Sequence, residues 1–209
     1  MKDIINEIFG DTFEIKVKTN SLILEEKKAE TPKAVYLEWT NNVGSLKFDV
    51  LIGLISNERI EKIVLPILEK YKINEKGYGV CNSTINKFVR LEEQEEIFIN
   101  DLNSIKNHFE KIRNKIKDLL NPFFEKVTTI EGIHSYIKEL NEEELSETLS
   151  NPVLIRKIVV NFLAGSIDDL ELYCNNVEDE YREAEKLYPD IFMNHAQATK
   201  ELYQVLKSL

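Results

Sequence analysis

The side chains in this sequence that could do chemistry are three histidines, two cysteines and many carboxylates. Glu131 and His134 form a Glu-x-x-His pair, which places a carboxylate and an imidazole on one helix face, as diiron carboxylate proteins require. Such a centre needs a second Glu-x-x-His, and the sequence has none. Glu131 also has capping-box spacing from Thr128, which gives it a structural role. We therefore predict no metal ligands and no cofactor.

The other candidates for catalysis lack the partners that catalysis needs. Cys81 and Cys174 have no CxxC spacing and no histidine at ligand spacing, which indicates two buried, reduced thiols. His108 and His195 stand apart from any cysteine, serine or paired acid in a nucleophile arrangement. The paired carboxylates are typical of exposed helix surfaces, where burial cannot separate two pKa values. We predict no catalytic residue, and the sequence favours a protein that is not an enzyme.

Charge is unevenly distributed along the chain. Residues 141–190 contain thirteen carboxylates and four basic side chains, and so carry −9 of the formal net charge of −10. Such a surface repels nucleic-acid phosphates and anionic membranes and attracts cationic partners. We expect a basic protein as the partner, no nucleic acid and no membrane, although solvated helix faces alone would give the same pattern. The expected partner-binding residues are Asp168, Asp169, Glu171, Glu178, Asp179 and Glu180.

The composition is that of an ordinary folded protein, with 43% apolar and 31% charged residues in a chain of 209. The first residues mix charges with apolar side chains, unlike a secretory signal, and no apolar run approaches the thickness of a bilayer. These features predict a cytoplasmic protein with a sizeable core.

The first half of the chain has mainly strand patterns, with two predicted hairpins. The segments with these patterns are 13–17, 22–24, 34–40, 46–55 and, less regularly, part of 78–91. The turn at 41–45 contains Asn and Gly, which tolerate the positive φ of a hairpin turn. Ser56 is the candidate N-cap of one helix within this half, and Pro66 should kink or break that helix.

The second half has helical patterns. The acidic run at 92–96 is predicted to begin a helix, because carboxylates complement the positive end of the helix dipole. Apolar residues from Phe98 to Phe123 then recur every three or four positions and form a stripe. This stripe needs a cover, either other helices of the same chain or the same stripe of a second copy. Everything beyond Thr128 is predicted to be helical, with breaks near Pro152, Gly165 and Pro189.

Together these patterns predict an α+β fold, in which an N-terminal antiparallel sheet of hairpins packs against helices and the C-terminal half is all helical. We divide the chain into a β-rich part with one helix, residues 1–91, and a helical part, residues 92–209. We expect both parts to belong to one continuous globular unit.

Four short segments resemble small bacterial proteins found beside toxin genes as immunity factors. The segments are FDVLIGL at 48–54, LNPFF at 120–124, TIEGI at 129–133 and FLAG at 162–165. They contain packing and turn residues and no functional group, so the resemblance assigns no site residue. It implies a cytoplasmic protein that binds another protein.

Three hypotheses of function follow. The first is a non-enzymatic protein-binding module, most concretely an immunity-type inhibitor whose acidic helices cover a basic toxin or enzyme. The second is an enzyme with a dispersed active site between the sheet and the helices, which would bring histidines or carboxylates into one apolar cleft. The third is a helical scaffold that dimerises through the stripe, so the chain is a monomer or a homodimer.

Overall fold

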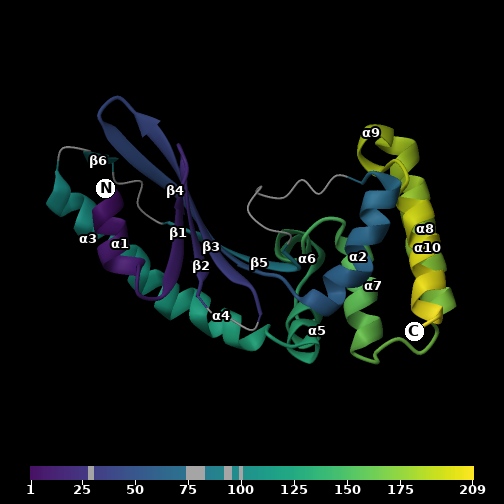
Figure 1. Ribbon diagram of the computed structural model, residues 1–209. Helices are drawn as coiled ribbons and strands as arrows, with labels where there is room; N and C mark the ends of the chain where they lie inside the picture. Colours follow the sequence, from purple (N-terminus) through teal and green to yellow (C-terminus); the bar gives the residue numbers. More distant parts are fainter. Residues whose placement is uncertain (28–30, 74–82, 92–95, 99–100) are drawn as a thin grey trace. The chain divides into compact units, whose positions relative to one another are not determined.

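The computed structural model describes residues 1–27, 31–73, 83–91, 96–98 and 101–209. The fold is α+β, as predicted. It forms two compact units, each made of two separate segments of the chain (Figure 1). Unit 1 consists of Met1–Ser56 and Ile85–Thr128 and contains the sheet; unit 2 consists of Asn57–Thr84 and Thr129–Leu209 and is built from helices.

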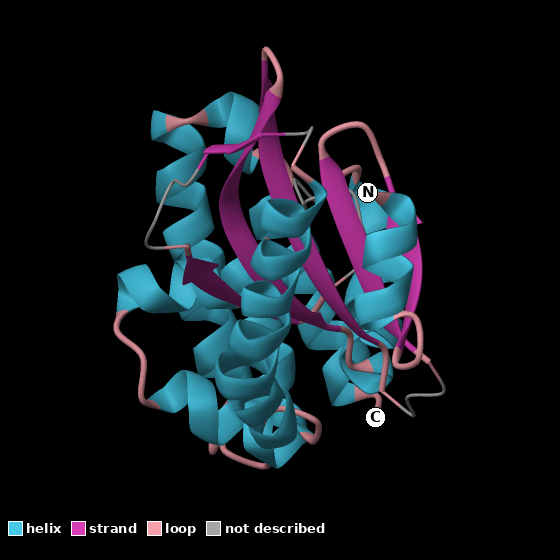
Figure 2. Cartoon of the chain, turned by 90° about the vertical axis from the view of Figure 1, so that its left-hand side faces the viewer, coloured by secondary structure: helices cyan, strands magenta, loops and turns pink. Residues whose placement is uncertain are grey.

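The sheet of unit 1 is antiparallel, and neighbouring strands follow the order of the chain. Its main path consists of β1 (Phe13–Val17), β2 (Ser21–Glu26), β3 (Lys33–Asn42), β4 (Ser45–Ile55) and β5 (Ile85–Arg90). A short strand, β6 (Glu96–Phe98), pairs with the beginning of β4. The two longest strands, β3 and β4, form a twisted hairpin that turns at Gly44 with φ of 82° (Figure 2). Both predicted hairpins are therefore confirmed.

The helices of unit 1 either carry the apolar stripe or pack against it. They are α1 (Lys2–Phe9), α3 (Leu102–Lys115), the π-helical turn η1 (Ile116–Leu120) and α4 (Asn121–Lys126). The ring of Phe109 on α3 packs edge-on against Phe48 of β4 and Phe9 of α1, with centroids 5.6 and 6.3 Å apart. A Cβ on Gly53 of β4 would come within 3.0 Å of Leu120, so glycine permits this close approach of helix and sheet. The middle of the stripe is thus buried within the chain, against the sheet and α1.

The helices of unit 2 come from both of its chain segments. They are α2 (Glu58–Tyr71), α5 (Ile130–Lys138), α6 (Glu142–Thr148), α7 (Val153–Leu163), α8 (Leu170–Leu187), α9 (Pro189–Phe192) and α10 (His195–Lys207). Pro66 lies inside α2 without ending it. Helix α10 packs against both α8 and α2 (Figure 1). Within the described segments, no helix combines the length and the apolar character that a membrane span needs.

Three details of the sequence analysis are wrong. The helix predicted to begin in the run 92–96 begins later, because the Asp101 carboxylate accepts hydrogen bonds from the backbone of Asn103 and Ser104. Glu96 belongs instead to β6, and residues 92–95 lie outside the described residues. The N-caps of α2 and α5 are Asn57 and Thr129, each one residue beyond the predicted cap. Helix α1 was not predicted at all.

Candidate functional site

Helix α8 carries most of the predicted partner-binding residues. It begins where the Asp169 carboxylate accepts a hydrogen bond from the amide of Leu172 at 2.9 Å, an N-cap. Cys174, Val177 and Tyr181 face the interior at helical spacing. Most of the remaining positions are exposed, and the amphipathic pattern therefore turns most carboxylates of α8 outward, while Glu178 and Glu185 are partly buried.

Three of the six predicted residues are engaged within the chain. Asp169 is the N-cap. Glu171 accepts a hydrogen bond from the Tyr203 hydroxyl on α10 at 3.0 Å. Glu178 is paired with Arg182 one turn later, with 3.1 Å between Oε1 and Nε. These three carboxylates have structural partners, so they are poorer candidates for binding another protein.

The other three predicted residues are Asp168, Asp179 and Glu180. All are exposed, and none has a hydrogen bond or ion pair from its side chain to the described residues. Asp179 and Glu180 are neighbours on α8, whereas Asp168 lies before the helix, about 15 Å away at 1.5 Å per residue. The structure therefore brings two of the six together as an unpaired acidic pair.

An exposed apolar cluster lies at the end of α8, and the sequence analysis missed it. We call it the α8–α9 corner; it consists of Leu187, Tyr188, Ile191 and Met193, with exposed fractions of 73, 58, 57 and 61%. The helix ends here because Tyr188 precedes Pro189, which begins α9. Asp190, also exposed, stands among these residues. Several large exposed apolar side chains close together in the chain, beside a charged residue, are typical of protein interaction sites.

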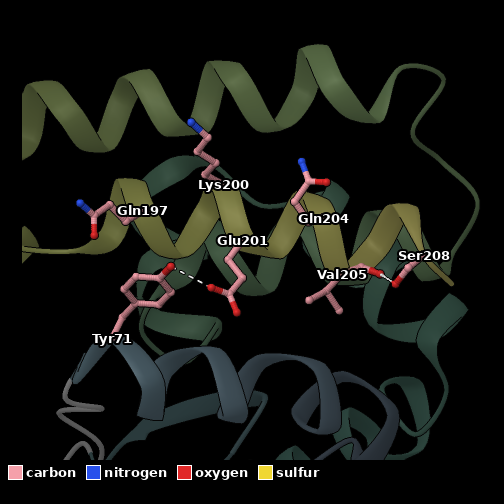
Figure 3. A pocket seen from close by; sticks show the side chains of 7 residues that line it. All are labelled: Tyr71, Gln197, Lys200, Glu201, Gln204, Val205 and Ser208. Atoms are coloured by element: carbon pink, nitrogen blue, oxygen red, sulfur yellow. Dashed lines mark hydrogen bonds between the residues drawn. The ribbon is translucent and has the colours of Figure 1, made fainter.

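A groove of about 670 Å³ lies in unit 2 where the end of α2 faces α10. Tyr71 and Glu201 point toward each other across it, while Lys200 and Gln204 point away from Tyr71 (Figure 3). The Tyr71 hydroxyl donates to Glu201 at 2.8 Å, which raises the pKa of Tyr71. Hydrogen bonds from Lys70 and Tyr71 lower the pKa of Glu201. Because its carboxylate is held from both sides, Glu201 joins α2 to α10 and is unsuited to act as a base.

A cleft of about 340 Å³ in unit 1 lies between the sheet and the helical segment from α3 to α4. Of its basic side chains, Lys33 pairs with Glu26 at 3.3 Å, whereas Arg113 and Lys117 are exposed and pair with none of the described residues. No histidine is among the described residues that line it. Its carboxylates are Glu26, which is paired with Lys33, and Glu125.

A charged pair lies inside unit 2. Arg156 of α7 is 0% exposed and donates two hydrogen bonds to Glu61 of α2, from Nε at 3.0 Å and from Nη2 at 2.8 Å. The Thr84 hydroxyl donates to the same carboxylate at 2.7 Å and accepts from the amide of Asn57 at 2.8 Å. Since the network is buried and its members bond to one another, it connects distant segments of unit 2 and is closed to a substrate.

Burial also argues against the nucleophile candidates. Cys174 is buried, and burial raises the pKa of its thiol to about 11, so little of the reactive thiolate forms. Burial lowers the pKa of His195, whose ring packs against Tyr181 at 5.0 Å between centroids. No group of three or more potential metal ligands occurs within the described part of the chain. Cys81 lies outside the described residues.

No protein-family model, no curated protein and no solved structure matches this chain.

Proposed function

We propose that the protein is a non-enzymatic binding module that recognises a basic protein through the α8–α9 corner and the neighbouring pair Asp179 and Glu180. The observation that carries this proposal is the position of exposed apolar side chains at the end of a helix that also carries Asp179 and Glu180, whose side chains are unpaired among the described residues. Apolar and aromatic anchors supply most of the affinity of a protein interface. Carboxylates beside them accelerate the encounter with a cationic partner and select against acidic ones.

The most concrete form of this function is an immunity-type inhibitor that acts in the cytoplasm and covers the basic surface of a toxin or enzyme. Such an inhibitor needs a complementary surface and no catalytic residue. The charge of the two units supports an inhibitor of this kind, since unit 2 is acidic and unit 1 is nearly neutral. A basic partner would therefore be attracted mainly to unit 2.

The test compares capture from a lysate of the native cells by three forms of the protein. Tyr188→Ser with Ile191→Ser removes the anchors of the corner, and Leu172→Ser is the matched control, since Leu172 is 58% exposed at the opposite end of α8. We expect one basic protein to bind the wild type and the control but not the corner variant. Equal capture by all three forms, or by none, would contradict the proposal.

The electrostatic part has its own test. With the captured protein in hand, Asp179→Lys with Glu180→Lys should slow association about tenfold or more at low salt and much less at high salt, because screening removes the steering field. Dissociation should change little. An association rate that ignores both the substitutions and the salt would leave only the apolar part of the surface.

A further inference from the structure

Strand β1 is the edge of the sheet on one side. Among the described residues it pairs only with β2. The amide of Lys18 donates to the carbonyl of Ser21, and the amide of Lys27 donates to the carbonyl of Thr12. Because hydrogen-bonded pairs alternate in an antiparallel ladder, the even-numbered residues of β1 bond to β2. The backbone amides and carbonyls of Phe13, Ile15 and Val17 therefore point to the open edge.

This edge is accessible from solvent. A hollow of about 360 Å³ is lined by four consecutive residues of β1, from Phe13 to Lys16, by Asn6 of α1, by Gly10 just after α1 and by Lys27 just after β2. Because consecutive residues of a strand point to opposite faces, a hollow lined by four in a row follows the strand along its edge. An accessible row of unpaired backbone groups is a template on which another strand can pair.

The sequence of β1, Phe-Glu-Ile-Lys-Val, is complementary to itself in the antiparallel direction. With Ile15 opposite Ile15 of a second copy, Glu14 lies opposite the second copy's Lys16, and Lys16 opposite its Glu14. Phe13 lies opposite Val17 in the same register, so apolar residues meet on the other face. Opposite charges and apolar pairs at directly facing positions both stabilise antiparallel strands.

Within one chain, Glu14 is in an unfavourable position. The register of β1 and β2 places it directly opposite Glu25, a like charge. Lys16 bridges to Glu25 at 2.7 Å, while the Glu14 side chain has no hydrogen bond or ion pair with the described residues. In its own chain, Glu14 faces a second carboxylate instead of a cation. In the proposed dimer it would face Lys16 of the second copy, an opposite charge.

The apolar face of β1 is also incompletely covered. Phe13 packs edge-on against Phe9 of α1, with centroids 6.4 Å apart, and Ile15 is half-buried. Val17 on the same face remains 38% exposed. In the self-paired register, Phe13 of the second copy would lie against Val17 and reduce this exposure.

We propose that β1 is a homodimer interface, at which two copies pair antiparallel about Ile15 and their sheets become continuous. Hydrogen-bonded pairs form between residues 13 and 17, 15 and 15, and 17 and 13 of the two copies. One short strand pair buries less area than a stable interface of about 1,600 Å², so the dimer is weak. This interface is separate from the α8–α9 corner and does not depend on the function proposed for it.

The first test uses charge reversal and its rescue, with Kd measured by sedimentation equilibrium. Glu14→Lys should weaken the dimer about tenfold or more, because both cross-strand charge pairs become repulsive. Glu14→Lys combined with Lys16→Glu restores opposite charges at both positions and should bring Kd back within about threefold of the wild type. Glu147→Lys makes the same charge change at an exposed site in unit 2 and should leave Kd unchanged.

Misfolding cannot imitate this result, since Glu14→Lys places a cation opposite Glu25 and so removes a like-charge pair within the chain. The melting temperature of this variant should therefore stay the same or rise. A wild type that remains monomeric at millimolar concentration overturns the proposal. A dimer that the single reversal leaves intact, or that the double reversal fails to restore, also overturns it.

The second test removes one backbone donor. Ile15→Pro deletes an amide that points to the open edge, so the ladder between β1 and β2 keeps its hydrogen bonds, and proline is tolerated at such positions. We expect this variant to be folded and monomeric at concentrations where the wild type dimerises. An Ile15→Pro variant that is folded and dimerises as the wild type does would exclude pairing through this edge.

Discussion

The interior of unit 1 contains a cluster of aromatic rings among aliphatic side chains, whereas the interior of unit 2 encloses a charged pair. In unit 1, Phe9, Phe48 and Phe109 meet edge-on, and Gly53 lets a helix lie directly on the sheet. In unit 2, Arg156 and Glu61 are almost fully buried and bind each other through two hydrogen bonds. The stability of unit 1 therefore depends on close packing, and that of unit 2 depends on every buried polar group having a partner.

This difference predicts how each unit responds to substitution. A closely packed apolar core is sensitive to added volume, since the side chains around the added atoms have little room to move. A buried ion pair is sensitive to the loss of one partner, because the other is left charged and without water. Removing both partners together is far less costly. We therefore expect overpacking to destabilise unit 1 and an unpaired buried charge to destabilise unit 2. Substitutions can test each effect separately.

The largest effect is expected from Arg156→Met. It leaves the Glu61 carboxylate buried with only the Thr84 hydroxyl as a donor among its present partners, which should cost about 3–5 kcal/mol. Urea unfolding measures the loss, and hydrogen exchange shows where it falls. Amides of unit 2 should lose protection, and those of unit 1 should keep theirs.

The matched control is Arg156→Met combined with Glu61→Leu. Because no charge then remains buried, the double variant should recover most of the stability lost in the single one. If the double variant were as unstable as Arg156→Met, the pair would stabilise unit 2 by filling space and not by pairing charges. The two interiors would then depend on the same kind of interaction.

The next effect is expected from Gly53→Ala in unit 1. The added Cβ would lie 3.0 Å from a Leu120 methyl carbon and 3.1 Å from the Phe124 ring, closer than ordinary contact. Overpacking of this kind costs about 1–3 kcal/mol. Thermal unfolding should show the loss, with exchange now faster in unit 1. In a protein that also carries Phe124→Leu, Gly53→Ala should lower the free energy of unfolding by less, because the ring that it meets is gone. If the losses of stability from the two single variants simply add in the double variant, there is no clash with the ring.

The smallest effect separates two carboxylates within unit 2. Asp169→Ala removes the N-cap of α8 and should cost about 1 kcal/mol. Asp179→Ala removes an exposed side chain without partners among the described residues, and should stay within about 0.5 kcal/mol of the wild type. Both are compared by urea unfolding. Equal losses would show that Asp179 is also structural, and would weaken its place in the proposed surface.

The parts of the fold that the sequence predicts correctly depend on local patterns. The hairpins follow from alternation and from a turn at Gly44 that needs a positive φ. Helix α8 follows from its apolar spacing. The acidic run at 92–96 was misleading because Asp101 offers a better cap and because Ile97, 2% exposed, is buried opposite Leu46. Pairing with a distant strand outweighed the local charge pattern.

The candidate site could be predicted only in part. Net charge identified the acidic region, but not that Asp169, Glu171 and Glu178 would be held by partners inside the chain. The α8–α9 corner had one local signal, the Tyr188-Pro189 step after a run of apolar and acidic residues. Exposure of those apolar residues depends on which faces α10 covers, and a sequence pattern does not contain that information.

The interleaving of the two units has a consequence for synthesis on the ribosome. Unit 1 has all its residues once Thr128 has emerged, but Glu61 must wait for Arg156, 95 residues later in the chain. At about 5–20 residues per second this wait lasts roughly 5–20 s, which is long compared with the formation of a helix or a hairpin. Thr128 emerges 67 residues after Glu61, so for the last 28 residues of the wait, roughly 1.5–6 s, α2 is tethered at both ends to a unit that can already fold. The nascent chain therefore completes its sheet first, while Glu61 stays hydrated until α7 arrives.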